Sequence, residues 1–565
     1  MTRINFFLSL LILFFSLFAS LNIASAQDFT HVISNSENWR DVYSSLHYSN
    51  LKGVSSDFLV SRNHGTILLN DINKNNFIRV ISSSDRRFVV NYPSIIRDRD
   101  FRDVDELIVK NANLELIEEL PDIKNFVIVG NTYGYNAIAA VPYAIQNNAW
   151  VFFADRTTIA EIDSILMNRE VSNVLFYGHL EREIRDTLSK YNPEVINTGD
   201  RFLDNVEIVK KFAEKDSIRQ VLLTNGEFIE KELMGGRQPI LFTGKENVPT
   251  QIRDYIKSSD IEVGVLVGSD LVGAATNIRR DTGISVIVKF ARGARSPTGA
   301  VSAVEGLDLY FLPFPILNLT LNSVRYNTAT SNLEVTYESQ SNSPIYFRGQ
   351  IDLKGEDGRN IASVGDMDSV FISPNEFKTM IYPGVTLPGG EEITAEVYAL
   401  YGESTNSLEK ILQGSVILQR VSVIDNCDLE FLKVDYIKPQ KVFSIRVRNL
   451  GSADCWTNAE LVDIIFEGEK ITVGSGEAIL IRDGKKGNII IEKDMEDIDL
   501  EDNPFVDLVV YYGERKEGLV NTFRGRFELG IVWISTTIVF LILILLIILL
   551  FWIFLLAKRR RRKRR

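Results

Sequence analysis

The segments Phe126-Val127-Ile128-Val129 and Val151-Phe152-Phe153 decide the fold of the first half of this chain. Both are short apolar runs rich in Val, Ile and Phe, which are typical of strands buried on both faces of a parallel sheet. Similar runs recur at 174–176, 221–223, 240–242 and 265–267, and amphipathic stretches such as 159–166 and 202–212 lie between them. Alternating strands and helices predict an α/β fold for residues 27–312.

This region also repeats itself. Val32-Ile33, Tyr48 and Phe58 match Val127-Ile128, Tyr143 and Phe153 at a constant spacing of 95 residues. The segment 125–188 aligns in turn with 219–278, which places Phe153 opposite Phe242 and Gly178 opposite Gly268. A period of about 90 to 100 residues is too long for a solenoid repeat and fits a small α/β unit. The matches therefore predict three related units, at 27–120, 121–215 and 216–312.

A short motif follows the second unit's last predicted strand. The chain reads Gly199-Asp200-Arg201-Phe202 and continues into a helical run. The motif resembles the Asp-Arg-Tyr signature of the type 2 cell-wall-binding repeat family of bacterial and archaeal surface proteins, with Phe202 where that family usually has Tyr. The resemblance covers about residues 30–293, and degenerate versions of the motif are Arg99-Asp100-Phe101 and Arg279-Arg280-Asp281.

The resemblance implies three flavodoxin-like units in a surface protein. In bacteria such triplets hold proteins on anionic wall polymers. A triplet in the ectodomain of a chain with a single membrane anchor is more similar to an archaeal surface or surface-layer protein. The four motif residues, Gly199 to Phe202, are then the residues that carry the family signature.

From about residue 315 the pattern changes to alternation with period two, as in Leu317, Leu319 and Leu321. Tight-turn sequences separate these runs, which is typical of β-sandwiches. We expect two immunoglobulin-like β-sandwiches, at 315–423 and 424–527, stacked as a stalk beneath the α/β head. Cys427 and Cys455 are the only two cysteines. In a secreted chain they predict one disulfide, and the alternative is a pair of buried thiols.

The two ends of the chain predict its topology. Residues 1–26 combine Arg3, an apolar run and Ala24-Ser25-Ala26, which is the pattern of a cleaved signal peptide. Residues 531–557 carry no charge and are long enough to cross a bilayer as one transmembrane helix. The basic tail 558–565 is expected to stay in the cytoplasm. We therefore expect a single-pass protein of the cell membrane whose ectodomain lies outside the cell.

Few other residues suggest chemistry. Asn318-Leu319-Thr320 is a sequon and predicts a glycan on Asn318, although an unused sequon within a strand is the alternative. The acidic run 492–502 is either a calcium-binding segment or a solvated loop, and it lacks the glycine of an EF-hand. The sequence contains no zinc-ligand spacing, no P-loop and no nucleophile elbow.

These observations predict a non-enzymatic, membrane-anchored protein of the cell envelope, with a structural, surface-layer-like or adhesive role. Its only candidate cofactor is calcium. The expected partners are the membrane, envelope polysaccharide and neighbouring surface proteins, including copies of the same chain in a lattice. The formal net charge of −12 argues against nucleic acid. The main alternative is a surface receptor that binds a carbohydrate or small solute through the α/β head, and an extracellular hydrolase is a third hypothesis.

Overall fold

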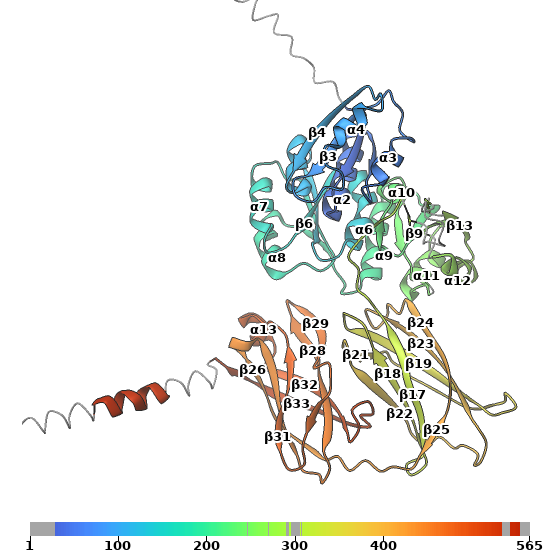
Figure 1. Ribbon diagram of the computed structural model, residues 1–565, viewed down its shortest axis with the longest axis vertical. Coiled ribbons are helices and arrows are strands. Elements are labelled where there is room, and N and C mark those ends of the chain that lie inside the picture. Colours follow the sequence, from blue (N-terminus) through green and yellow to red (C-terminus); the bar gives the residue numbers. More distant parts are fainter. Residues whose placement is uncertain are drawn as a thin grey trace, which may run out of the picture.

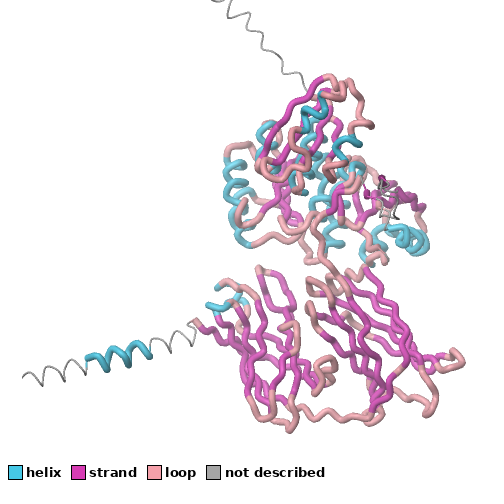
Figure 2. Tube along the Cα trace, in the orientation of Figure 1, coloured by secondary structure: helices cyan, strands magenta, loops and turns pink. Residues whose placement is uncertain are grey.

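The computed structural model describes residues 29–245, 247–268, 271–289, 293–294, 305–306, 308–533 and 543–553. The predicted signal peptide and the basic tail lie outside the described residues. The first half of the chain forms an α/β head, and two all-β domains lie beneath it (Figure 1). Helices are concentrated in the head, whereas the lower part consists almost entirely of strands (Figure 2).

The head contains three four-stranded sheets in which every pairing is parallel. Each sheet has the same order, with the unit's second strand at one edge, followed by its first, third and fourth. The strands are β1 (His31–Asn35), β2 (Ser55–Phe58), β3 (Phe77–Ser83) and β4 (Asp103–Val109) in unit 1; β5 (Asn125–Gly130), β6 (Ala149–Ala154), β7 (Asn173–Tyr177) and β8 (Glu194–Ile196) in unit 2; and β9 (Gln220–Thr224), β11 (Ile240–Phe242), β12 (Val263–Val267) and β13 (Ser285–Lys289) in unit 3.

Helices connect these strands. They are α2 (Trp39–Lys52), α3 (His64–Leu68), α4 (Tyr92–Arg97) and α5 (Ala112–Glu115); α6 (Tyr135–Gln146), α7 (Ile159–Met167), α8 (Arg182–Leu188) and α9 (Arg201–Ala213); and α10 (Lys231–Met234), α11 (Thr250–Ser258) and α12 (Val272–Thr282). Two short strand pairs complete the head, β10 (Phe228–Ile229) with β16 (Tyr310–Phe311) and β14 (Gly293–Ala294) with β15 (Glu305–Gly306).

The prediction of three repeated α/β units is confirmed. Phe58, Phe153 and Phe242 all lie at or next to the ends of equivalent edge strands, β2, β6 and β11. All six residues of β6 are buried, as expected for a strand covered on both faces. The largest apolar cluster includes Val42 of α2, Ala140 of α6 and buried residues of all three units. The three units therefore share this apolar cluster and form one head.

A buried asparagine joins unit 1 to unit 2, and another joins unit 2 to unit 3. Asn113 on α5 donates to the Val151 carbonyl (2.8 Å) and accepts from the Phe153 N–H (2.9 Å) at the edge of β6. Asn205 on α9 makes the same pair of bonds to Ile240 (2.9 Å) and Phe242 (2.8 Å) of β11. Each side-chain amide takes the place of a neighbouring strand and satisfies buried backbone groups at a sheet edge.

The second half forms two all-β domains with separate apolar cores. β-domain 1 comprises β17 (Leu319–Asn327), β18 (Asn332–Ser339), β19 (Ile345–Lys354), β20 (Asn360–Gly365), β21 (Val370–Ile372), β22 (Phe377–Tyr382), β23 (Thr394–Gly402), β24 (Lys410–Ile417) and β25 (Gln419–Val421). β-domain 2 comprises β26 (Leu429–Ile437), β27 (Val442–Asn449), β28 (Cys455–Phe466), β29 (Glu469–Gly474), β30 (Ile479–Ile481), β31 (Lys486–Glu492), α13 (Asp497–Asp502), β32 (Phe505–Gly513) and β33 (Asn521–Val532).

The two β-domains share a construction. The first strand of each carries a bulge, after Leu321 in β17 and after Phe431 in β26. In β-domain 2 the last strand, β33, pairs antiparallel with β32 and then parallel with β26, so that it belongs to both sheets. In β-domain 1, β24 pairs antiparallel with β23, and β25 directly after it pairs parallel with β17.

The predicted stalk of stacked domains is wrong. The two β-domains lie side by side, and both contact the head (Figure 1). Lys378 of β-domain 1 is 1% exposed and forms ion pairs with its neighbour Glu376 (3.6 Å) and with Glu460 of β-domain 2. Its ammonium also lies 3.5 Å from the centre of the Tyr511 ring. A buried cation shared between two domains holds them laterally, and the sequence patterns did not reveal this contact.

The C-terminal end of β-domain 2 also differs from the prediction. Ile531 and Val532 still belong to β33, so a transmembrane helix does not begin at 531. Residues 543–553 are helical, and the remainder of the predicted span beyond Trp533 lies outside the described residues. Among the residues that the structure describes, no helix is both long and apolar enough to cross a membrane.

The asparagine that joins units 2 and 3 provides a first test. Replacing Asn205 by Ala leaves the Phe242 N–H and the Ile240 carbonyl buried without a partner, and each such group costs about 1–3 kcal/mol. We expect Asn205→Ala to lower the thermal denaturation midpoint of the full chain by several degrees, whereas Asn168→Ala at an exposed helix end should leave it nearly unchanged. Equal midpoints for the two variants would contradict the role given to Asn205.

The lateral contact of the β-domains predicts a dependence on pH. Burial raises the pKa of Glu376 from 4.5 to about 7. Its contribution to stability is therefore fully present below about pH 4.5 and is lost as the pH rises through about 7. Glu376→Gln should flatten the pH dependence of the denaturation midpoint across this range, whereas Glu430→Gln on an exposed position of β26 should keep the wild-type slope. A wild-type slope in Glu376→Gln would show that this carboxyl does not titrate there.

Candidate functional site

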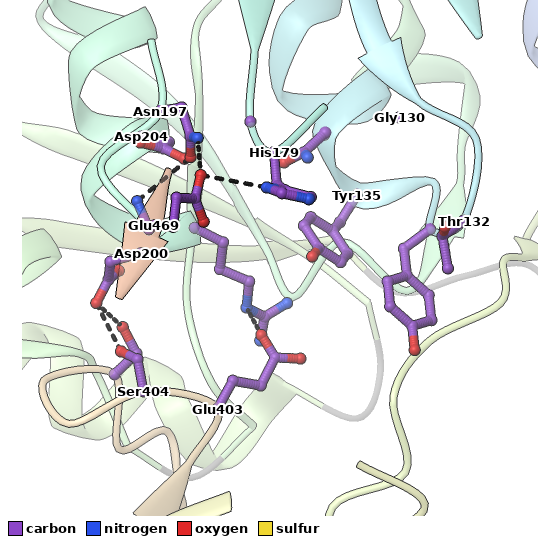
Figure 3. Close-up of a pocket in the computed structure, with 16 residues that line it drawn as sticks. Gly130, Thr132, Tyr135, His179, Asn197, Asp200, Asp204, Glu403, Ser404 and Glu469 are labelled. Atoms are coloured by element: carbon purple, nitrogen blue, oxygen red, sulfur yellow. Dashed lines mark hydrogen bonds and ion pairs between the residues drawn. The ribbon is translucent and has the colours of Figure 1, made fainter. Parts of the chain in front are cut away.

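A cavity of about 310 Å³ lies where the head meets both β-domains. Its upper wall comes from unit 2, and its lower wall comes from Glu403, Ser404 and Ser407 of β-domain 1 and Glu469 of β-domain 2. Figure 3 shows polar side chains from these separate segments around one space. The other lining residues are Gly130, Thr132, Tyr133, Tyr135, Asn136, Gly178, His179, Asn197, Gly199, Asp200, Arg201 and Asp204.

The topology of unit 2 explains this position. β5 lies between β6 and β7, so the chain leaves β5 to one side for β6 and later returns to the other side for β7. Ligands of open α/β sheets bind at such a point, outside the carboxyl ends of the strands. Gly130 ends β5, and Gly178 follows β7 with φ +75°. A Cβ at Gly178 would lie 2.2 Å from the Asn136 amide nitrogen, so glycine is required here.

Asp200 of the family motif joins the head to β-domain 1. One of its carboxylate oxygens caps α9 by accepting from the N–H groups of Phe202 (2.9 Å) and Leu203 (3.1 Å). The other oxygen accepts from the hydroxyls of Ser404 (2.8 Å) and Ser407 (2.6 Å). A helix cap within the head is thus also a contact between domains.

Arg201 makes a stronger contact at the same junction. Its guanidinium forms ion pairs with Glu403 (2.9 Å) and Glu409 (2.5 Å) of β-domain 1, and its side chain is only 6% exposed. The guanidinium also lies over the rings of Tyr135 (5.1 Å) and Phe314 (4.8 Å). Burial alone would lower the pKa of Arg201, but the two carboxylates raise it, so the group is charged.

The rest of the motif is structural. Phe202 is fully buried in the core of the head, and Gly199 has φ +77°, which glycine adopts without strain. The proposed degenerate copies are not equivalent to the motif. Arg99-Asp100-Phe101 precedes the last strand of unit 1, and Arg279-Arg280-Asp281 lies within α12, before the last strand of unit 3. The segment equivalent to the motif in unit 1 is Asn111-Ala112-Asn113, which follows β4 and begins α5.

β-domain 2 closes the cavity with Glu469. This carboxylate accepts a hydrogen bond from Asn197 and lies 3.2 Å from His179 Nδ1, and that contact raises the pKa of His179. Burial raises the pKa of Glu403 to about 7 and that of Asp204 to about 6. The cavity walls carry more carboxyl groups than cationic groups. Because the pKa values of Glu403 and Asp204 are raised, these two carboxyl groups are partly protonated near neutral pH.

The acidic run 492–502 lies beside this junction. Arg182 of α8 pairs with Glu496 (3.1 Å) and with Asp499, which is fully buried. Lys438 pairs with Asp497, and Lys441 pairs with Asp494. The run is therefore solvated along most of its length, but it contains the short helix α13, whose buried Asp499 contacts the head. No group of three or more His, Cys, Asp or Glu side chains in the described part of the chain is arranged to hold a metal ion.

The remaining predicted sites lie in the β-domains. Cys427 and Cys455 form the predicted disulfide, with Cα atoms 5.6 Å apart. Asn318 directly precedes β17 and is half-buried, and its amide nitrogen donates to Gln340 (3.0 Å). Glycosylation of Asn318 stays a prediction.

Sequence reasoning missed the residues that β-domain 1 and β-domain 2 contribute to the cavity. One loop between β23 and β24 contains Glu403, Ser404, Ser407 and Glu409. Its sequence looks like that of an ordinary polar turn. Glu469 begins β29 and also lacks a motif. No local pattern marks these residues, because their role arises only when the domains meet.

No family model matches this sequence, and no curated protein matches it. Among solved structures the chain is similar to Cwp6 from Clostridium difficile, with 15% identity and a TM-score of 0.35 over 46% of this chain and 54% of that chain. It is also similar to the YadV chaperone (12% identity, TM-score 0.13, 38% of this chain and 98% of that chain) and to the periplasmic chaperone SfaE (11%, 0.15, 37% and 99%). The chain thus spans about half the length of Cwp6, and TM-scores this low do not establish a shared fold.

The buried guanidinium provides a test of the junction. Arg201→Leu leaves Glu403 and Glu409 without their cation, and breaking such a buried pair costs about 3–5 kcal/mol. We expect a large drop in the denaturant midpoint and faster proteolytic cleavage between the head and β-domain 1. Arg280→Leu, whose side chain is 69% exposed, should leave the denaturant midpoint nearly unchanged. A stable, protease-resistant Arg201→Leu protein would contradict this role.

Proposed function

We propose that this chain is a non-enzymatic protein of the cell surface, with a structural or adhesive role in the envelope. The observation that carries the proposal is the closed arrangement of its three parts. Arg201 joins the head to β-domain 1, Arg182 joins the head to β-domain 2, and Lys378 joins the two β-domains to each other. Each part is held by the other two, so the ectodomain behaves as one rigid block.

Rigidity of this kind suits a load-bearing or lattice-forming subunit. Truncating one partner of a buried ion pair leaves a charge without compensation, so each junction resists opening. A catalytic protein with a cleft between domains usually needs those domains to move. In this chain the crevice at the switch point of unit 2 is closed by residues from both β-domains. The partners proposed are neighbouring surface proteins, copies of the same chain, and envelope polysaccharide.

We further propose that the apolar segment after Trp533 anchors the protein in the cell membrane, with the basic tail 558–565 on the cytoplasmic side. The signal-like residues 1–26 would direct the remainder outside the cell. The acidic composition, with a formal net charge of −12, supports a soluble ectodomain facing an aqueous exterior.

A second candidate function is a surface receptor for a small solute. The cavity favours it, because its volume of about 310 Å³ lies within the range of small-molecule sites. The two functions are compatible in one molecule, since a rigid ectodomain also presents a preorganised cavity.

Electron cryotomography of the native envelope, with an antibody label on the head, tests the structural role. We expect label at a fixed height above the membrane and in a regular array. A variant that ends at residue 533 should be released into the medium and should leave the cell surface unlabelled. Sparse, unordered label on wild-type cells would overturn the lattice role and leave an adhesive or receptor function. Retention of the shortened variant on cells would overturn the anchor.

A further inference from the structure

Four buried polar atoms at the junction cavity lack a hydrogen-bond partner. They are Arg201 Nε, Arg201 Nη1, Glu403 Oε1 and Asn136 Oδ1. Arg201 Nε forms an ion pair with Glu403 Oε2 (2.9 Å), whereas Arg201 Nη1 and Glu403 Oε1 face no such partner. Buried polar groups are almost always paired, because a missing bond is costly. Unpaired donor atoms of Arg201 and unpaired acceptor atoms of Glu403 and Asn136 around one cavity therefore indicate a ligand that carries both kinds of group.

One side of the cavity presents hydrogen-bond donors. The first two residues of α6, Tyr135 and Asn136, line it, and no side chain caps this 12-residue helix at Gly134. The N-terminus of a helix of this length favours a negative group through its free N–H groups and its dipole. Arg201 Nη1 adds an unpaired N–H donor of a guanidinium that Glu403 and Glu409 already pair with through its other nitrogens, and its side chain is only 6% exposed.

The other side presents hydrogen-bond acceptors. The other carboxylates on the cavity wall already have partners. Asp200 accepts from two serines, Asp204 accepts from Thr198, and Glu469 contacts Asn197 and His179. Glu403 Oε1 has no such partner. The rings of Tyr133 and Tyr135 are stacked with their centres 5.8 Å apart and also line the cavity, so they offer an aromatic surface beside this carboxylate.

We infer that this cavity binds a small zwitterion, an amino-acid-like solute whose carboxylate is held by Arg201 Nη1 and the N-terminus of α6 and whose ammonium is held by Glu403 Oε1 and Asn136 Oδ1. A neutral sugar would offer these atoms hydroxyl groups only, without the stronger charge-assisted hydrogen bonds that a carboxylate and an ammonium form. An anionic polymer would meet the surrounding carboxylates. The inference rests on the receptor function proposed above and does not depend on a lattice.

The thermal denaturation midpoint of the full chain in detergent measures this binding. The probes are glucose and the amino acids glycine, L-serine and L-lysine. Each amino acid is compared with its Nα-acetyl derivative, which has no α-ammonium, and with its methyl ester, which has no carboxylate. We expect at least one free amino acid to raise the midpoint. Each blocked form should bind at least about tenfold more weakly, because each loses a charge-assisted hydrogen bond.

A variant that blocks the entrance locates the effect. Thr132 lines the cavity and is exposed, so Thr132→Trp should abolish the shift without lowering the midpoint of the unliganded protein. Thr66→Trp, at an exposed threonine of unit 1, should keep the shift. Equal binding of blocked and free amino acids, or an undiminished shift in Thr132→Trp, would overturn the inference. A shift with glucose but with no amino acid would overturn the zwitterion and keep the receptor, whereas no shift with any probe would overturn both.

Discussion

The arrangement of the head and the two β-domains depends on one buried guanidinium. Arg201 begins α9 in the head, yet its charge is neutralised by Glu403 and Glu409, which belong to β-domain 1. In an isolated head this charge would lie over the Tyr135 and Phe314 rings without a carboxylate partner. The head therefore supplies the cation and β-domain 1 supplies the carboxylates of one buried ion-pair cluster. The same logic recurs at Lys378, where a second buried cation lies between two carboxylates from different domains.

Two carboxylates surround each buried cation. Burial is the main cause of the raised pKa values of Glu376 and Glu403, and the second carboxylate at each junction raises them further. Burial of such groups is costly unless the charges are paired, so these junctions contribute specificity of arrangement more than raw stability. The buried pair of Arg201 lies where the head meets both β-domains. There the crevice at the switch point of unit 2 becomes a closed cavity with walls that no single domain provides.

The sequence allowed the three α/β units to be predicted because their buried strands recur at fixed spacing, as Phe58 and Phe153 show. The motif Asp200-Arg201 could be found in the sequence, but its role could not, since its partners lie about 200 residues away in a loop that has no recognisable sequence pattern.

The β-domains contain a sequence repeat that the periodicity analysis did not use. Val324 and Tyr326 match Val434 and Tyr436 at a spacing of 110 residues, and each tyrosine hydroxyl bonds a backbone carbonyl, that of Val385 (2.8 Å) or Lys493 (3.1 Å). The lateral packing of these domains depends on single side chains such as Lys378 and could not be read from periodicity.

The last strand of β-domain 2 has a mechanical consequence. β33 pairs with β32 along most of its length and with β26 at its end, and the chain leaves the domain from that end. A pull on this end acts along the strand axis, so the hydrogen bonds to both neighbours are loaded in shear and must break together. A pull across the strand would instead open them one at a time. If the chain is held at its C-terminal side while force is applied to the head, the pairing of β33 with β32 and β26 sets the resistance of β-domain 2 to unfolding under that force.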